Sequence, residues 1–90
     1  MANDRYQLLF DAANQQRYFA TRRDLLRGAL RLSLFLQGSK RVAVYERQAP
    51  APGRVGVRFA LAAELDLADA PTLRRLEAEL AELTAAGRDD

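Results

Sequence analysis

Side chains able to transfer protons, attack substrates or bind transition metals are scarce in this sequence. Histidine and cysteine are both absent, which removes the usual general base and the two commonest transition-metal ligands. Ser39 and Lys40 are adjacent at a predicted turn and point apart, and Asp66 and Asp69 are placed to cap a helix start. Nucleotide and calcium-loop motifs are absent as well. We therefore expect no enzyme activity, no catalytic residue, no metal site and no cofactor.

Basic residues form the clearest candidate binding surface. Arg23, Arg27 and Arg31 recur every four residues, which places them on one face of a helix. Their guanidinium groups are suited to phosphates of a nucleic-acid backbone or to carboxylates of an acidic protein. The alternative is that these arginines form an ordinary solvent-exposed helix face and bind no partner. The full candidate set for partner or phosphate binding comprises Arg22, Arg23, Arg27, Arg31, Lys40 and Arg41.

The charges are divided unevenly along the chain. Residues 1–60 hold 11 arginines and lysines against 4 acids, a net +7, whereas residues 61–90 hold 3 against 8, a net −5; the whole chain carries +2. A basic body with an acidic last third favours an anionic partner, or an acidic segment that lies over the body or over a second copy.

A stripe of leucines in the acidic part is the second candidate surface. The stripe consists of Leu73, Leu76, Leu80 and Leu83, spaced three, four and three residues apart and flanked by glutamates. Two turns of such a pattern are too short to hold a coiled coil alone, so the stripe must pack on something. Its own sheet is one solution, and a homodimer or a partner protein is the other.

The elements that must position these residues begin with a strand at about Arg5–Ala12, a polar turn around Asn14, and a second strand at Arg17–Ala20. Alternation of apolar and polar residues predicts both strands, which pair as a hairpin. Thr21 and Asp24 then form an acidic variant of the capping box, so a helix is expected over 22–37, ended by Gly38. Gly28 inside this helix indicates close packing against a neighbour.

The second half repeats the order of elements. Arg41–Gln48 alternates as a strand, a proline-rich loop follows, and the alternation from Val55 to Ala63 is the clearest strand signal in the chain. Asp69 and Pro71 mark the start of a helix that runs to about Ala86.

Together these patterns predict an α+β fold of order ββαββα. Two β-hairpins form one four-stranded antiparallel sheet, with both helices packed on one face. The pattern does not determine the order of the strands. The face toward the helices is expected to carry Tyr6, Leu8, Phe10, Val42, Val44, Val55, Val57, Phe59 and Leu61.

Composition points to one small globular protein. Of the 90 residues 49% are hydrophobic and 29% are charged, as in ordinary folded domains, and no apolar run is long enough to cross a bilayer. We expect a single domain over 1–90 with a frayed end at 87–90, soluble and cytoplasmic, without membrane contact. The expected function is that of a small accessory or regulatory protein that binds another protein through the basic helix face or the leucine-striped helix. The alternative is a nucleic-acid-binding regulator that uses the first helix.

Overall fold

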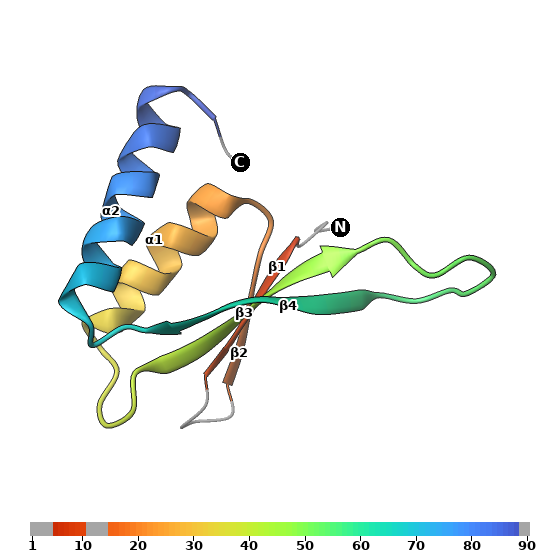
Figure 1. Ribbon diagram of the computed structural model, residues 1–90, viewed down its shortest axis with the longest axis horizontal. Helices are drawn as coiled ribbons and strands as arrows, with labels where there is room; N and C mark the ends of the chain where they lie inside the picture. The colour runs from red at the N-terminus through yellow and green to blue at the C-terminus, as the bar shows by residue number, and fades with distance from the viewer. Residues whose placement is uncertain (1–4, 11–14, 89–90) are drawn as a thin grey trace.

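The structure, a computed structural model, describes residues 5–10 and 15–88 of the chain. It is an α+β fold of order ββαββα, as predicted (Figure 1). Its elements are β1 (Tyr6–Phe10), β2 (Gln15–Phe19), α1 (Arg22–Ser33), β3 (Arg41–Gln48), β4 (Arg58–Asp66) and α2 (Ala70–Ala85). In the described part of the chain neither helix has the length and apolarity needed to cross a membrane.

The four strands form one sheet in the order β2-β1-β3-β4, and every neighbouring pair is antiparallel. Because β2 and β3 both run opposite to β1, they are parallel to each other, and α1 carries the chain from one to the other across a face of the sheet. Both helices lie together on this side of the sheet (Figure 1). No helix of the described residues covers the opposite side, here called the open face.

The core lies between the sheet and the two helices. Tyr6, Leu8 and Phe10 of β1 point into it, in register with Val42 and Val44 of β3, and all five are buried. Leu25, Leu26 and Ala29 of α1 and Leu67 and Leu76 complete the buried cluster. The alternation in the first and third strands therefore predicted the core-facing side correctly.

Helix α1 begins where the capping signal predicts and ends earlier than expected. Thr21 is the N-cap, and its side-chain oxygen accepts a hydrogen bond from the Asp24 amide. The helix ends at Ser33 and not at Gln37, because the Leu34 amide donates back to the Arg31 carbonyl and tightens the last turn. Gly38 has the positive φ of +80° expected of a terminating glycine, but it lies in the following loop.

Gly28 marks a close approach, as its place inside a helix predicts. A Cβ atom at this position would lie 2.5 Å from the ring of Phe19 on β2. Only glycine lets the helix sit this near the aromatic ring.

Strand β2 begins at Gln15, so Gln15 and Gln16 belong to the strand and not to the predicted turn. The rest of that turn, Asn14, and the predicted end of the first strand at Ala12 lie outside the described residues. The short β2 strand is exposed except at Phe19, which faces the helices.

The predicted last strand is wrong in its start and in part of its face. Val55 and Val57 lie in the loop before β4 and are exposed. Ala62 is an extra residue between the pairs Tyr45–Leu61 and Val44–Ala63, which makes a β-bulge. A bulge shifts the side-chain alternation by one residue. Phe59 and Leu61 therefore lie on the open face, whereas Ala63 and Leu65 pack toward the helices.

Helix α2 is capped at both ends. The Asp69 side chain accepts from the Thr72 amide and hydroxyl at 3.0 and 2.6 Å, and Pro71 occupies the first turn as predicted. Gly87, from the predicted frayed end, has a φ of +67°. With Arg88 it donates to the Thr84 and Leu83 carbonyls in a Schellman motif. Residues 89–90 lie outside the described residues.

Candidate binding surfaces

The outward face of α1 carries a mixed basic and apolar surface. Arg27 and Arg31 are exposed and stand one turn apart, on the side away from the buried Leu25, Leu26 and Ala29. Arg23, half-buried, begins the same row. We call Arg23, Arg27, Arg31, Leu34 and Phe35 the α1 surface. Its arginines were predicted, and its apolar end was not.

Leu34 and Phe35 end the α1 surface because the helix stops early. They follow Arg31 by three and four residues, and their exposed fractions are 80% and 72%. The sequence pattern placed them in the buried leucine stripe of a longer helix, which is wrong. The sequence does hold a signal for their exposure: residues 22–33 alone contain enough apolar side chains to cover the sheet, so Leu34 and Phe35 exceed what the core needs.

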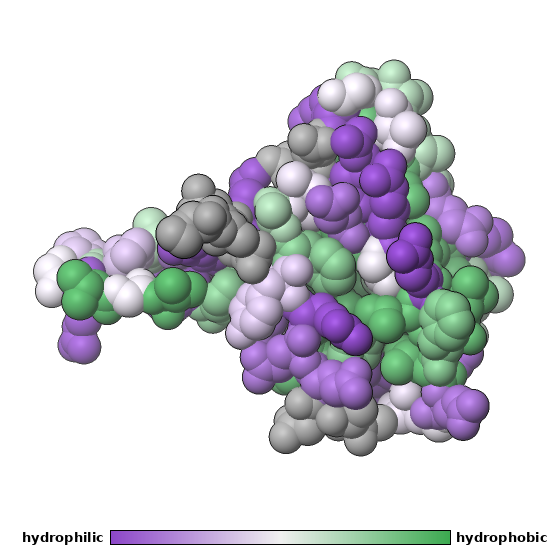
Figure 2. Space-filling model, turned by 180° about the vertical axis from the view of Figure 1, so that it is seen from behind, coloured by the Kyte–Doolittle hydropathy of each residue, from purple (hydrophilic) through white to green (hydrophobic). Residues whose placement is uncertain are grey.

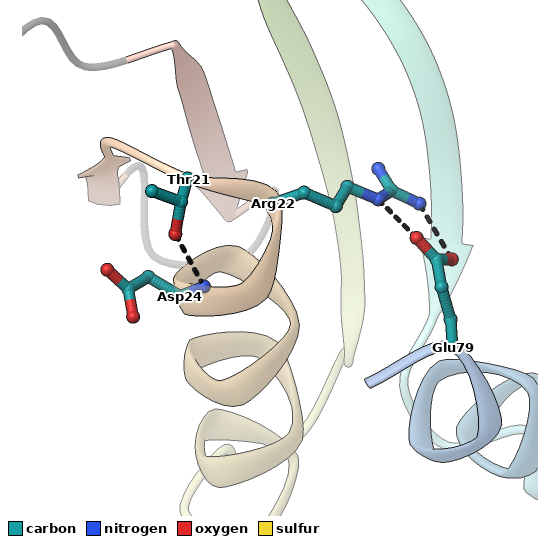
Figure 3. A network of polar contacts seen from close by, with 4 residues as sticks. All are labelled: Thr21, Arg22, Asp24 and Glu79. Carbon is teal, nitrogen blue, oxygen red and sulfur yellow. Dashed lines mark hydrogen bonds and ion pairs between the residues drawn. The ribbon is translucent and has the colours of Figure 1, made fainter. Parts of the chain in front are cut away.

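Arg22, another candidate for partner binding, is used inside the protein. Its Nε and Nη2 donate to the two carboxylate oxygens of Glu79 on α2, at 2.6 and 3.0 Å (Figure 3). The hydrogen bond to Glu79 raises the pKa of Arg22 above its ordinary value. The same bond lowers the pKa of Glu79. Both groups stay charged, and the pair joins the two helices.

Lys40 and Arg41 have different surroundings. The Lys40 Nζ donates to the Ser33 carbonyl at 3.0 Å, which satisfies an unpaired oxygen at the end of α1. Arg41 is exposed at the start of β3, opposite Asp66 of β4. The structure thus separates the six predicted residues: Arg27 and Arg31 share one exposed face, whereas Arg22 and Lys40 hold elements together.

The leucine stripe of α2 faces inward. Leu76 is buried, and Leu73, Leu80 and Leu83 are partly buried against the core. The stripe therefore packs on the chain's own core, with α1 as the neighbouring element, and not chiefly on the sheet as the pattern suggested. The outer side of α2 is left with exposed alanines and the exposed Glu77 and Glu82. Self-association through these leucines stays a prediction.

The open face of the sheet is richer in apolar side chains than expected. The residues that the strand registers place there are Gln7, Leu9, Gln16, Tyr18, Arg41, Ala43, Tyr45, Arg47, Phe59, Leu61, Glu64 and Asp66. Tyr18 and Phe59 come from the two edge strands, yet their ring centroids lie 6.1 Å apart, a distance typical of aromatic pairs. Gln7 and Gln16 are hydrogen-bonded to each other and to the Tyr18 hydroxyl. Half of Tyr18 and of Leu61 remains exposed.

A hollow of about 460 Å³ opens on this face near the start of β3 and the end of β4. Leu9, Ala43 and Tyr45 give it an apolar floor, and Glu64, Asp66 and Arg41 lie at its rim. The balance of charge at the rim is therefore negative.

At the other end of β3 and β4 the chain extends as a projecting arm, residues 47–58 (Figure 1). The Arg47 amide donates to the carbonyl of Arg5, the residue before β1, and among the described residues the strand register of β1 with β3 goes no further than Glu46. The exposed fractions of Val55 and Val57 are 100% and 62%, and apolar surface is visible along the arm (Figure 2). Arg47, Arg54 and Arg58 give it three positive charges, and it holds no acidic residue. Sequence reasoning missed the arm because Val55 and Val57 continue the alternation of β4.

The described residues offer surfaces for contact and little for chemistry. No three potential metal-ligating side chains among them gather closely enough to hold an ion. The pKa of Asp69 is lowered by the Thr72 hydroxyl and amide, and that carboxylate already caps α2. The groups with clearly displaced pKa values, Arg22, Glu79 and Asp69, all have structural partners.

Comparisons of the chain with known protein families, with curated proteins and with solved structures found no match.

Proposed function

We propose that this chain is a small, non-catalytic accessory or regulatory protein that binds an acidic protein partner through the α1 surface. The proposal applies to the cytoplasm, a reducing compartment in which a chain without cysteine loses no stabilising disulfide.

The observation that carries the proposal is the continuation of the arginine row into Leu34 and Phe35. Protein-binding sites combine an apolar or aromatic anchor with arginine, because the anchor is desolvated while the guanidinium selects carboxylates. Burial of an exposed phenylalanine or leucine contributes about 1.5 to 3 kcal/mol. Two such side chains therefore supply much of the binding energy of a modest complex.

Nucleic-acid binding is the second candidate, and Arg27 and Arg31 support it as well. Phosphate binding relies on positive charge and gains little from an exposed leucine. It also favours several cations side by side, whereas Asp24 lies 3.9 Å from Arg27 on this face and Arg22 is paired with Glu79. Charge and apolar area together favour a protein.

The test is capture of binding partners from a lysate of the source cells by the purified chain, with and without nuclease. Three forms are compared: wild type, Arg27→Glu with Arg31→Glu, and Leu34→Ser with Phe35→Ser. We expect a protein that stays bound after nuclease and is lost with either double variant. Circular dichroism of both variants should match wild type, because all four side chains are exposed.

A matched control reverses charge elsewhere. Glu77 and Glu82 are exposed on the outer side of α2, and Glu77→Arg with Glu82→Arg should leave capture unchanged. Material that disappears with nuclease, binds with a steep salt dependence and is unaffected by Leu34→Ser with Phe35→Ser would instead establish the nucleic-acid function. Capture that is unaffected by both α1 double variants would refute the proposal.

A further inference from the structure

The arm and the hollow at opposite ends of the β3–β4 hairpin have matching chemistry. The arm is basic and apolar, with Val55 and Val57 exposed beside Arg54. The hollow has an apolar floor and a rim in which Glu64 and Asp66 outnumber Arg41. Within one chain the two cannot meet, because the length of the paired strands separates them (Figure 1).

We propose that the open face binds a second copy of this chain, with each arm seated in the hollow of the other copy. The two open faces pack against each other, related by a two-fold axis perpendicular to the strands. The β3–β4 hairpins of the two copies then run in opposite directions. The basic arm of each copy then lies at the acidic end of its partner, and the contact closes on itself. This interface leaves the α1 surface free, so it is independent of the function proposed above.

The surface between arm and hollow is suited to the same contact. Passing along the open face from the hollow toward the arm, the strand pairs are Ala43 with Glu64, Tyr45 with Leu61, and Arg47 with Phe59. The middle of this path is therefore apolar and aromatic, with charges at its two ends. A single antiparallel sheet exposed to water normally carries polar residues on its free face, so this composition fits a covered one.

A second copy is favoured over other occupants by the charges. The arginines of the arm, Arg47, Arg54 and Arg58, have no ion-pair partner among the described residues. Glu64 at the hollow has none there either. Two copies related by the axis pair both sets at once, whereas a different partner would have to be basic at one end and acidic at the other.

Charge reversal with complementation tests the interface. Sedimentation of wild type over a concentration series should show a reversible dimer that weakens with salt. Arg54→Glu and Glu64→Arg alone should each weaken the dimer about tenfold or more, because both place like charges in contact. An equal mixture of the two variants should recover dimers of close to wild-type strength, since every arm then faces a hollow of opposite charge.

The matched control is Glu82→Arg, the same charge change on the outer side of α2, which should leave the dimer unchanged. The chain has no cysteine, so disulfide cross-linking of introduced cysteines provides a second measurement without interference from native thiols. Val55→Cys combined with Ala43→Cys should form a covalent dimer on oxidation, whereas Val55→Cys combined with Ala78→Cys, on exposed α2, should not.

Several outcomes would overturn the proposal. The first is that wild type sediments as a monomer at every concentration. The second is a dimer whose strength is unaffected by Arg54→Glu and Glu64→Arg, and the third is a mixture of these variants that does not recover dimers. A monomer whose binding to a duplex DNA fragment is lost in Arg54→Glu would assign the arm to nucleic acid instead. The α1 variants are tested in a separate assay, the capture of partners from a lysate. Absence of the dimer would therefore not bear on the partner proposed for the α1 surface.

Discussion

Arg22 and Glu79 stand 57 residues apart in the chain and form an ion pair through two hydrogen bonds, of 2.6 and 3.0 Å. The pair links the first turn of α1 to the middle of α2 (Figure 3). Both side chains are about one third exposed, so solvent weakens their attraction without removing it. Paired geometry of this kind is the stronger form of an arginine–carboxylate contact.

Glu79→Gln is expected to lower the free energy of unfolding by about 1 kcal/mol, a value between an exposed and a buried pair. Urea unfolding measures it. The matched control is Glu77→Gln on the same helix, an exposed carboxylate whose loss should change stability by less than about 0.5 kcal/mol. Equal effects of the two substitutions would show that the pair contributes nothing specific.

The same pair predicts a dependence on pH. Its hydrogen bond lowers the folded-state pKa of Glu79 below the ordinary value of 4.5. A carboxyl group shifted in this direction stabilises the folded state above its unfolded pKa, and the contribution is lost as pH falls through the folded pKa. We expect wild type to lose stability below about pH 4.5 more steeply than Glu79→Gln. Urea unfolding at several pH values measures both slopes.

The Glu79→Gln variant should retain part of the pH dependence. Asp69 accepts hydrogen bonds from Thr72, which lower its pKa below the ordinary value of 3.8, so its capping contribution is also lost at acid pH. Parallel curves for wild type and Glu79→Gln would mean that Glu79 has the same pKa in the folded and unfolded chain.

Gly28→Ala should destabilise the protein although alanine is the better helix former. The exchange gains about 1 kcal/mol of helix propensity. The new methyl group, however, would lie 2.5 Å from the Phe19 ring, and overpacking of this kind typically costs about 1 to 3 kcal/mol. We expect a net loss of about 1 kcal/mol in thermal or urea unfolding.

The double variant separates the two contributions. In a Phe19→Ala background the clash is gone, so Gly28→Ala should become neutral or stabilising there. A cycle of the four proteins measures the interaction between the two sites. Additive effects would mean that Phe19 does not limit position 28.

Local signals in the sequence predicted much of the fold. The caps at Thr21 and Asp69 and the limits of β3 at Arg41 and Gln48 agree with the structure. Each depends on neighbouring residues: a side-chain oxygen that satisfies a nearby amide, or an alternation uninterrupted over eight residues. The pairing of Arg22 with Glu79 depends on tertiary contact, and no local pattern contains it.

The candidate surfaces were predicted in part for the same reason. The four-residue spacing of Arg27 and Arg31 predicted that they share one helix face, and the structure confirms this. The exposure of Leu34 and Phe35 depends on where α1 ends, and four further apolar-rich positions made a longer helix equally compatible with the pattern. The arm was missed because alternation continues through Val57, and only the tertiary structure shows that the described pairing of β3 with β1 ends at Glu46.

The bulge at Ala62 leads to the last prediction, because it leaves one of the two leucines of β4, Leu65, to support the fold. Unbroken alternation from Val55 would point Leu61 into the core and Leu65, an even number of residues later, with it. The bulge leaves Leu61 on the open face, 55% exposed, and lets Leu65 pack against the core. Leu65→Asn should therefore cost about 2 kcal/mol, whereas Leu61→Asn should cost less than about 0.5 kcal/mol. Urea unfolding at low protein concentration, where self-association does not contribute, compares them. A larger loss for Leu61→Asn would place Leu61 in the core and remove the bulge.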